Sequence, residues 1–299
     1  MFDTSLEIIN TVKRENRPFY EYVIEIENER TGKSEEFIRS ELSHMLDVMG
    51  KSATDFLETP SVTNQHMIDG FANKMHVYAN ENEPIVGQFT AEAMAMAFST
   101  LEISAAMGKI VASPTAGSSG ILPAALMSFK QRYNCSHEEL IDAMLVAIGV
   151  GQLLGKYATF SGADGGCQAE TGSAAAMAAG AMIFLRGGSI EQVFHGASFA
   201  ILHVLGLVCD PIAGLVEYPC TFRNAMGVTN AMISADMALA GITSIVPFEE
   251  VCQAMRKVGK TLPPSLRETG MGGVAGTKTG QDIRRKFLGS CNISDDYED

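Results

Sequence analysis

Apolar residues recur at helical spacing along most of the chain, and Gly- and Pro-bearing breaks separate the apolar segments. Residues 1–60 are predicted to form three helices. Ser34 is a predicted N-cap for the third, over residues 35–50, because apolar side chains after it fall at roughly helical spacing. The hydrophobic pattern therefore predicts helices from the beginning of the chain.

Two capping boxes mark helix starts further along, at Ser136 with Glu139 and at Ser189 with Gln192. Residues 140–154 are apolar on nearly all sides, which is typical of a helix in the centre of a helical domain. In all, helices are predicted over residues 86–110, 122–129, 140–154, 170–185, 191–207, 224–242 and 247–259.

Periodicity weakens over residues 58–84, which carry turn signals throughout. A structureless connection of this length is usually functional or mobile, so we expect a long loop over a site. No Pro/Ser-rich linker divides the chain. We therefore expect an N-terminal helical extension with a loop (1–84), one helical domain (85–289) and an acidic flexible tail (290–299).

Composition agrees with the pattern. Hydrophobic residues make up 46% of the 299 positions and charged residues 19%, so most of the chain is folded. Trp is absent, aromatic residues are few, and Ala, Gly and Met fill the apolar share, which favours closely packed helices over a β-sandwich. The expected fold class is all-α.

The formal charge of −13 excludes one class of partner, because binding to nucleic acid needs a basic stripe and none is present. No signal pattern opens the chain, and no run of about 20 apolar residues lacks polar interruption, so we expect a cytoplasmic protein that does not span a membrane. In that reducing compartment the six cysteines are not expected to form a disulfide framework.

Three cysteines lie where the backbone leaves a helix-like segment, in Gly-Gly-Cys167, Cys209-Asp-Pro and Tyr-Pro-Cys220. The intervals between them, 41 and ten residues, fit neither zinc fingers nor electron-transfer ferredoxins. Three thiolates from separate loops can hold a cubane iron–sulfur cluster and leave one iron open as a Lewis acid. Three thiols without metal are the alternative.

A second special stretch, residues 113–120, places small and hydroxyl residues between two apolar helices. Free N–H groups in such a loop form a nest that suits a carboxylate. An ordinary connection between two helices is the alternative. A lyase reaction at an open iron would also need a general base to remove a proton from the substrate. The candidates within the chain are His203, which a core position would explain equally well, and Lys156, whose pKa would have to be lowered by burial.

Four segments resemble one known family: SPTAGSSGILP from residue 113, SGADGGCQAE from 161, LGLVCDPIAGLVEYPCTFRNAMG from 205 and LRETGMGGVAGT from 266. They are similar to the α chain of the two-subunit bacterial L-serine dehydratases that depend on an iron–sulfur cluster. The likeness extends over most of residues 85–280.

The resemblance implies a mostly helical domain that carries a [4Fe-4S] cluster on Cys167, Cys209 and Cys220, without pyridoxal phosphate. The implied reaction converts L-serine to pyruvate and ammonia, with the β-hydroxyl leaving from the open iron. The resemblance also implies a set of substrate-binding residues, with Arg267 as a further candidate: Thr115, Ala116, Gly117, Ser118, Ser119, Ser161, Arg223 and Asn224.

Relatives of this type work with a separate β chain that carries a Ser-Ser-His-Thr motif, which is missing here, so part of the active site is expected in trans, including a histidine base. The family pattern differs at residues 61–70, Ser104 and Tyr157. An L-cysteine desulfidase-type lyase, a paralogue for another β-substituted acid, and a non-catalytic subunit or sensor are therefore alternatives. Cys291 is a further candidate ligand, able to occupy the open iron.

Overall fold

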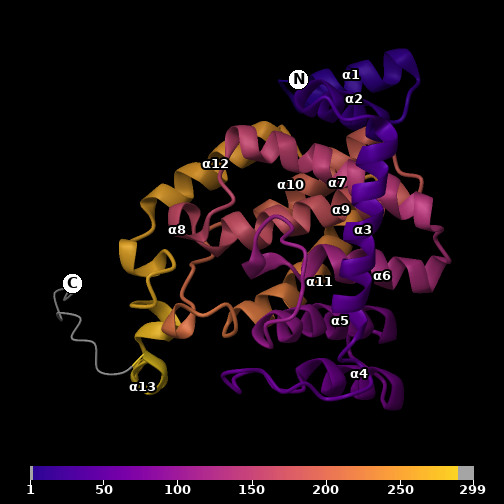
Figure 1. The fold of residues 1–299 in the computed structure, drawn as a ribbon. Helices are drawn as coiled ribbons and strands as arrows, with labels where there is room; N and C mark the ends of the chain where they lie inside the picture. Colours follow the sequence, from indigo (N-terminus) through magenta and orange to yellow (C-terminus); the bar gives the residue numbers. More distant parts are fainter. Residues whose placement is uncertain (1–2, 289–299) are drawn as a thin grey trace.

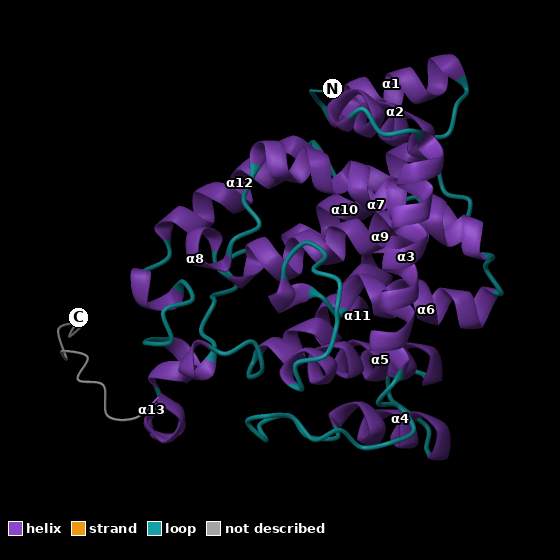
Figure 2. Cartoon of the chain, viewed as in Figure 1, coloured by secondary structure: helices purple, strands orange, loops and turns teal. Residues whose placement is uncertain are grey.

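The computed structural model describes residues 3–288, and within them the chain forms helices, turns and loops without a strand (Figures 1 and 2). The predicted all-α fold class is confirmed. Cys291 and the predicted acidic tail lie outside the described residues. The α-helices of the described part are α1 (Ser5–Glu15), α2 (Phe19–Thr31), α3 (Glu35–Thr54), α4 (Phe71–Glu81), α5 (Gln88–Ala105), α6 (Ile121–Tyr133), α7 (His137–Tyr157), α8 (Gly162–Gly165), α9 (Ser173–Leu185), α10 (Ile190–Leu202), α11 (Cys220–Leu239), α12 (Phe248–Thr261) and α13 (Lys278–Leu288).

Helix α9 lies at the centre of the core and packs against α6, α7, α10 and α11. All its residues from Ser173 to Ile183 are buried, and most of them are Ala or Gly. Small side chains let neighbouring helices approach closely. At Gly180, an added Cβ would lie only 3.1 Å from Val150 of α7 and 3.3 Å from Val193 of α10. The Ala-rich composition therefore builds the tightly packed centre of the bundle.

The N-terminal helices join the same core. In Figure 1, α1 and α2 lie at the top, and α3 runs down beside the bundle. Phe19 of α2 lies against Gly149 of α7, where an added Cβ would come within 2.4 Å of its ring. Ser34 caps α3 and both predicted capping boxes are formed, so the local start signals are confirmed. The division of the chain at residue 84 stays a prediction.

The prediction of a loop over residues 58–84 is partly wrong, because this segment contains helix α4. The buried carboxylate of Glu102, on α5, accepts a hydrogen bond from the backbone N–H of Ala72 at 2.9 Å. This cap comes from 30 residues away, so the local sequence gives no sign of it. Three predicted ends were also too late: α5 ends at Ala105, α10 at Leu202 and α11 at Leu239.

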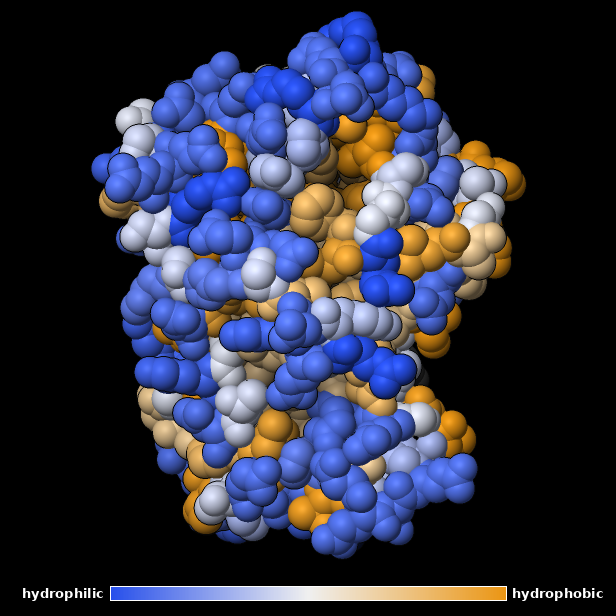
Figure 3. All heavy atoms as spheres, turned by 90° about the vertical axis from the view of Figure 1, so that its right-hand side faces the viewer, coloured by the Kyte–Doolittle hydropathy of each residue, from blue (hydrophilic) through white to orange (hydrophobic). Residues whose placement is uncertain are grey.

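Among residues 3–288, α7 is the one helix long and apolar enough to cross a membrane, but 67% of its apolar window is buried inside the protein. Burial of that kind is typical of a core helix. The face in Figure 3 is covered largely by hydrophilic side chains, with hydrophobic residues visible between them. The polar sides of the helices thus face outward on this side, as in other helical bundles.

Candidate functional site

The three cysteines come from three different elements and are all buried. Cys167 directly precedes a π-helical turn, Gln168–Gly172, that leads into α9; Cys209 lies in the loop after α10; Cys220 is the first residue of α11. Their exposed fractions are 2%, 2% and 5%. π-helical turns are rare and occur frequently at functional sites.

Backbone contacts join the first two cysteine segments. The N–H of Gln168 donates to the carbonyl of Leu207 at 3.0 Å. Gly166 has φ +75° and ψ 177°, a conformation that is essentially restricted to glycine. An added Cβ there would lie 2.7 Å from the same Leu207 carbonyl oxygen. The Gly-Gly break thus lets residue 167 lie beside the chain that leads to residue 209.

Each of the three thiols lies within electrostatic reach of at least one of the others. Burial raises the pKa of all three, and the neighbouring thiol of Cys167 raises those of Cys209 and Cys220 further. The Cys167 sulfur also lies 3.1 Å from the Thr171 hydroxyl. Three thiolates held this closely would repel one another, so a bound cation would favour their ionised form.

Glu170 is a site residue that the sequence analysis missed as such. Its Oε1 accepts a hydrogen bond from the Thr115 hydroxyl at 2.7 Å, and its Oε2 lies 3.7 Å from the Cys209 sulfur. Burial raises the pKa of this carboxyl group, and the nearby Glu268 raises it further. Gly117 fits against it only because it lacks a Cβ, which would lie 2.8 Å from Oε1. Glu170 thus connects the small-residue loop with the thiols.

The small-residue loop carries a short 3-10 turn, Ala116–Ser118, and is held to α11 by Asn224. The Asn224 amide accepts from the N–H of Gly120 at 2.9 Å and donates to the carbonyl of Gly117 at 2.7 Å. It also donates to the Cys220 carbonyl at 2.8 Å. The hydrogen bonds of this side chain, which is predicted to bind substrate, therefore fix the loop beside Cys220.

Two further segments enclose the site. The glycine-rich stretch 266–277 pairs with Cys209, whose N–H donates to the Leu266 carbonyl at 2.9 Å. On another side, Ile68 packs with Cys220 and Leu101 in a small buried cluster. Ile68, from the segment predicted to be a loop over a site, thus lies in the same buried cluster as Cys220. The role of the whole segment stays a prediction.

A sequence profile of the serine dehydratase alpha chain matches residues 14–275 of this protein. The chain belongs to the serine dehydratase alpha-chain family. Its sequence is 56% identical to an L-serine dehydratase alpha chain of Peptoniphilus asaccharolyticus over 288 residues, which cover 96% of this chain and 99% of that one. It is 43% identical to a probable L-serine dehydratase alpha chain of Bacillus subtilis, with 97% of each chain covered.

A third member is longer. The L-serine dehydratase of Streptomyces coelicolor is 36% identical over 258 residues, which cover 84% of this chain but only 56% of that protein. The family thus includes both chains of this length and chains in which the matching part is joined to additional sequence.

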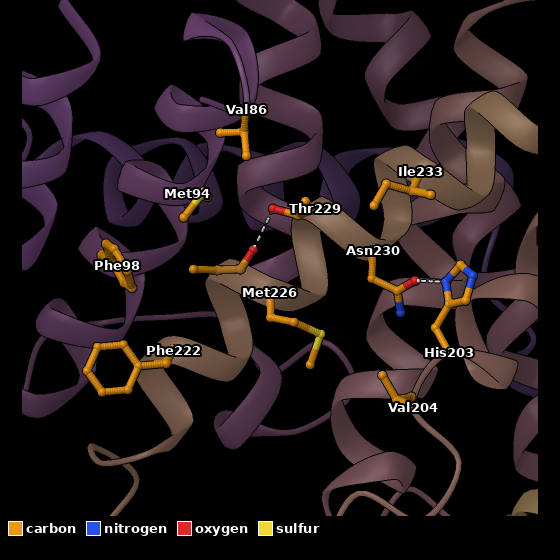
Figure 4. A pocket seen from close by; sticks show the side chains of 11 residues that line it. Val86, Met94, Phe98, His203, Val204, Phe222, Met226, Thr229, Asn230 and Ile233 are labelled. Carbon is orange, nitrogen blue, oxygen red and sulfur yellow. Dashed lines mark hydrogen bonds between the residues drawn. The ribbon is translucent and has the colours of Figure 1, made fainter. Parts of the chain in front are cut away.

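The structure places the two predicted bases away from the contacts just described. Lys156 pairs with Asp3 near the N-terminus, and its pKa is raised by that hydrogen bond, opposite to what a neutral base requires. His203 caps the end of α10 and bonds to Asn230. It lines a mostly apolar groove of about 540 Å³ on α11 (Figure 4). No described contact joins either side chain to a thiol.

The iron–sulfur cluster that the resemblance implies must fit the residues present at the three cysteines. Among residues 3–288, no three His, Cys, Asp or Glu side chains converge closely enough to hold a single metal ion. A cubane binds each cysteine through a different iron, so its ligands need not converge on one point. Buried thiols from three elements, with a buried guanidinium nitrogen of Arg223 left without a partner, fit such a group.

Proposed function

We propose that this protein is the catalytic subunit of an L-serine dehydratase, an L-serine ammonia-lyase that forms pyruvate and ammonia. The observation that carries the proposal is the burial of Cys167, Cys209 and Cys220, each near enough to another to influence its pKa, beside the loop of residues 113–120. Family membership and the names of the relatives support the substrate. A non-catalytic sensor would not need a substrate-binding loop of small residues fixed beside its thiols.

Cys167, Cys209 and Cys220 would hold the [4Fe-4S] cluster, which when bound supplies an open iron that acts as a Lewis acid on the β-hydroxyl. The proposal requires no pyridoxal phosphate. The residues of the chain supply the rest of the pocket. The loop residues Thr115, Ala116, Gly117, Ser118 and Ser119, with Ser161, are proposed to bind the substrate carboxylate.

Glu170 is placed to handle a proton between loop and thiols. Thr115 fixes one carboxyl oxygen and leaves the other on the side of Cys209. Because burial favours its protonated form, Oε2 can hold a proton near the departing hydroxyl. The removal of the α-proton is assigned to the partner chain, since the contacts of Lys156 and His203 lie elsewhere.

We also propose that the chain acts with a second subunit. The term alpha chain in the family name implies another chain, and the longer Streptomyces relative carries additional sequence in the same polypeptide. A subunit that supplies part of the active site would explain why no described histidine contacts the three thiols.

The test is an anaerobic assay of the chain purified with and without its co-expressed second chain. We expect pyruvate from L-serine only with both chains, in a fixed ratio to ammonia. Sulfide from L-cysteine with no pyruvate from L-serine would instead support the desulfidase-type alternative. No turnover of L-serine, L-cysteine or other β-substituted amino acids would contradict the assignment as an enzyme.

A further inference from the structure

Arg223 is a buried cation beside the thiols of Cys167 and Cys220. Its side chain is 13% exposed, and it lies on the first turn of α11, three residues after Cys220. Its Nη2 donates to Oδ1 of Asp210 at 2.6 Å, whereas its Nη1 is buried without a hydrogen-bond partner. A buried guanidinium nitrogen without a partner is costly, and its presence calls for an explanation.

Asp210 holds the guanidinium firmly in place. It directly follows Cys209, is 4% exposed, and accepts a second hydrogen bond from the N–H of Val274 at 2.7 Å. Gly273 leaves room for this carboxylate, since an added Cβ would lie 2.2 Å from Oδ2. The ion pair therefore joins the loop of one predicted cluster ligand to the helix of another.

The charges around the thiols also support a role for Arg223 at this site. Burial raises the pKa of the Cys167 and Cys220 thiols, and the positive charge of Arg223, which lies within hydrogen-bonding reach of Cys167, lowers both. Glu170 raises the pKa of both thiols, and Glu268 raises that of Cys220. Three thiolates placed here would add to that negative charge. A permanent positive charge with an unused N–H donor is what a buried anionic group needs.

We propose that Arg223 is a positioning residue for the group on Cys167, Cys209 and Cys220: anchored on Asp210, it offers that group its free Nη1 donor and its positive charge. This inference rests on the proposed function. It moves Arg223 from the predicted substrate-binding set to the metal site. The Asp210 anchor and the solvent-shielded Nη1 favour a permanent occupant over a substrate that enters and leaves.

The experiment compares cluster retention in the anaerobically purified full chain, co-expressed with its second chain. Arg223→Gln removes the charge and keeps a donor, Arg223→Lys keeps the charge, and Asp210→Asn loosens the anchor. Arg284→Gln is the matched control, because Arg284 donates to the Gly270 carbonyl in the same glycine-rich stretch and has no described interaction with a thiol. Iron is titrated against a chelator, and the midpoint potential is measured.

Residues that contact metal ligands typically contribute about 10- to 100-fold to metal affinity, so we expect Arg223→Gln to lose about 10- to 100-fold in its affinity for iron against the chelator. The midpoint potential should fall, because the reduced cluster loses a stabilising positive charge. In iron retention, Arg223→Lys and Asp210→Asn should lie between Arg223→Gln and wild type, and Arg284→Gln should match wild type in both readouts. The midpoint potential of Asp210→Asn should not fall, because that variant removes a negative charge. Circular dichroism of each variant checks folding, and Arg223→Lys carries the test if Arg223→Gln does not fold.

Unchanged iron retention and potential in Arg223→Gln, together with a raised KM for L-serine, would overturn the inference and return Arg223 to the substrate site. That result leaves the proposed function intact. A wild-type enzyme that turns over L-serine without iron would refute the cluster and this inference together. A wild-type chain that holds the cluster but has no activity would count against the reaction alone, and the comparison of the variants would still decide the role of Arg223.

Discussion

Replacing Asn224 with alanine should destabilise the protein strongly, because this amide fixes the loop of residues 113–120. In Asn224→Ala, the N–H of Gly120 and the carbonyl of Gly117 lose their partner, and both residues are buried. A buried polar group left unsatisfied costs about 1–3 kcal/mol, so two cost about 2–6 kcal/mol. Natural domains have a total stability of about 5–15 kcal/mol, which makes this loss severe.

The assay is urea unfolding of the full chain, followed by circular dichroism, with the free energy of unfolding extrapolated to water. Asn28→Ala is the control: its amide also donates to a backbone carbonyl, that of Lys33 at 2.7 Å, but at an exposed position. The control should change stability by about 0.5 kcal/mol or less. An Asn224→Ala variant as stable as the control would refute the role assigned to this side chain.

Two further predictions concern burial and backbone. Burial raises the pKa of the Glu102 carboxyl group above its ordinary value of 4.5. Its contribution to stability is therefore present below pH 4.5 and is lost as the pH rises through the raised pKa of the folded protein. Glu102→Gln should remove this loss, and parallel pH profiles of the free energy of unfolding for the two proteins would contradict the prediction. Gly166→Ala should cost about 2–5 kcal/mol, because its φ and ψ are essentially restricted to glycine and because an added Cβ would lie 2.6 Å from Leu262. Gly187→Ala, with φ +73° and nothing within 4 Å of the added Cβ, should cost about 1–2 kcal/mol. Equal losses in thermal unfolding of the two glycine variants would contradict the prediction for residue 166.

Local signals predicted much of the fold because their partners are close in sequence. The capping boxes at Ser136 and Ser189 each lie within four residues, and both are formed. Helix α4 escaped prediction because its cap, Glu102, lies 30 residues away. Burial in the centre also follows from composition alone, as the Ala-rich α9 shows.

The sequence identifies several residues of the candidate site but not the contacts between them. The three cysteines were singled out by the breaks in which they lie. Glu170 was not, although it follows Cys167 by three residues, because its partner Thr115 is 55 residues away. The structural contacts of Asn224 were not predictable either, since only the fold shows that its amide faces two backbone groups of the loop; its predicted part in substrate binding stays a prediction.

The most direct test of the central claim is the iron and acid-labile sulfide content of the anaerobically purified enzyme, in wild type and in single Cys→Ser variants at residues 167, 209 and 220. Cys252→Ser is the matched control, because Cys252 is fully buried and packs in the main core. The account predicts about four irons and four sulfides per chain in wild type and control, as in a [4Fe-4S] cluster, and a large loss in each of the three variants. Wild-type enzyme without iron, or full iron content in all three variants, would contradict it.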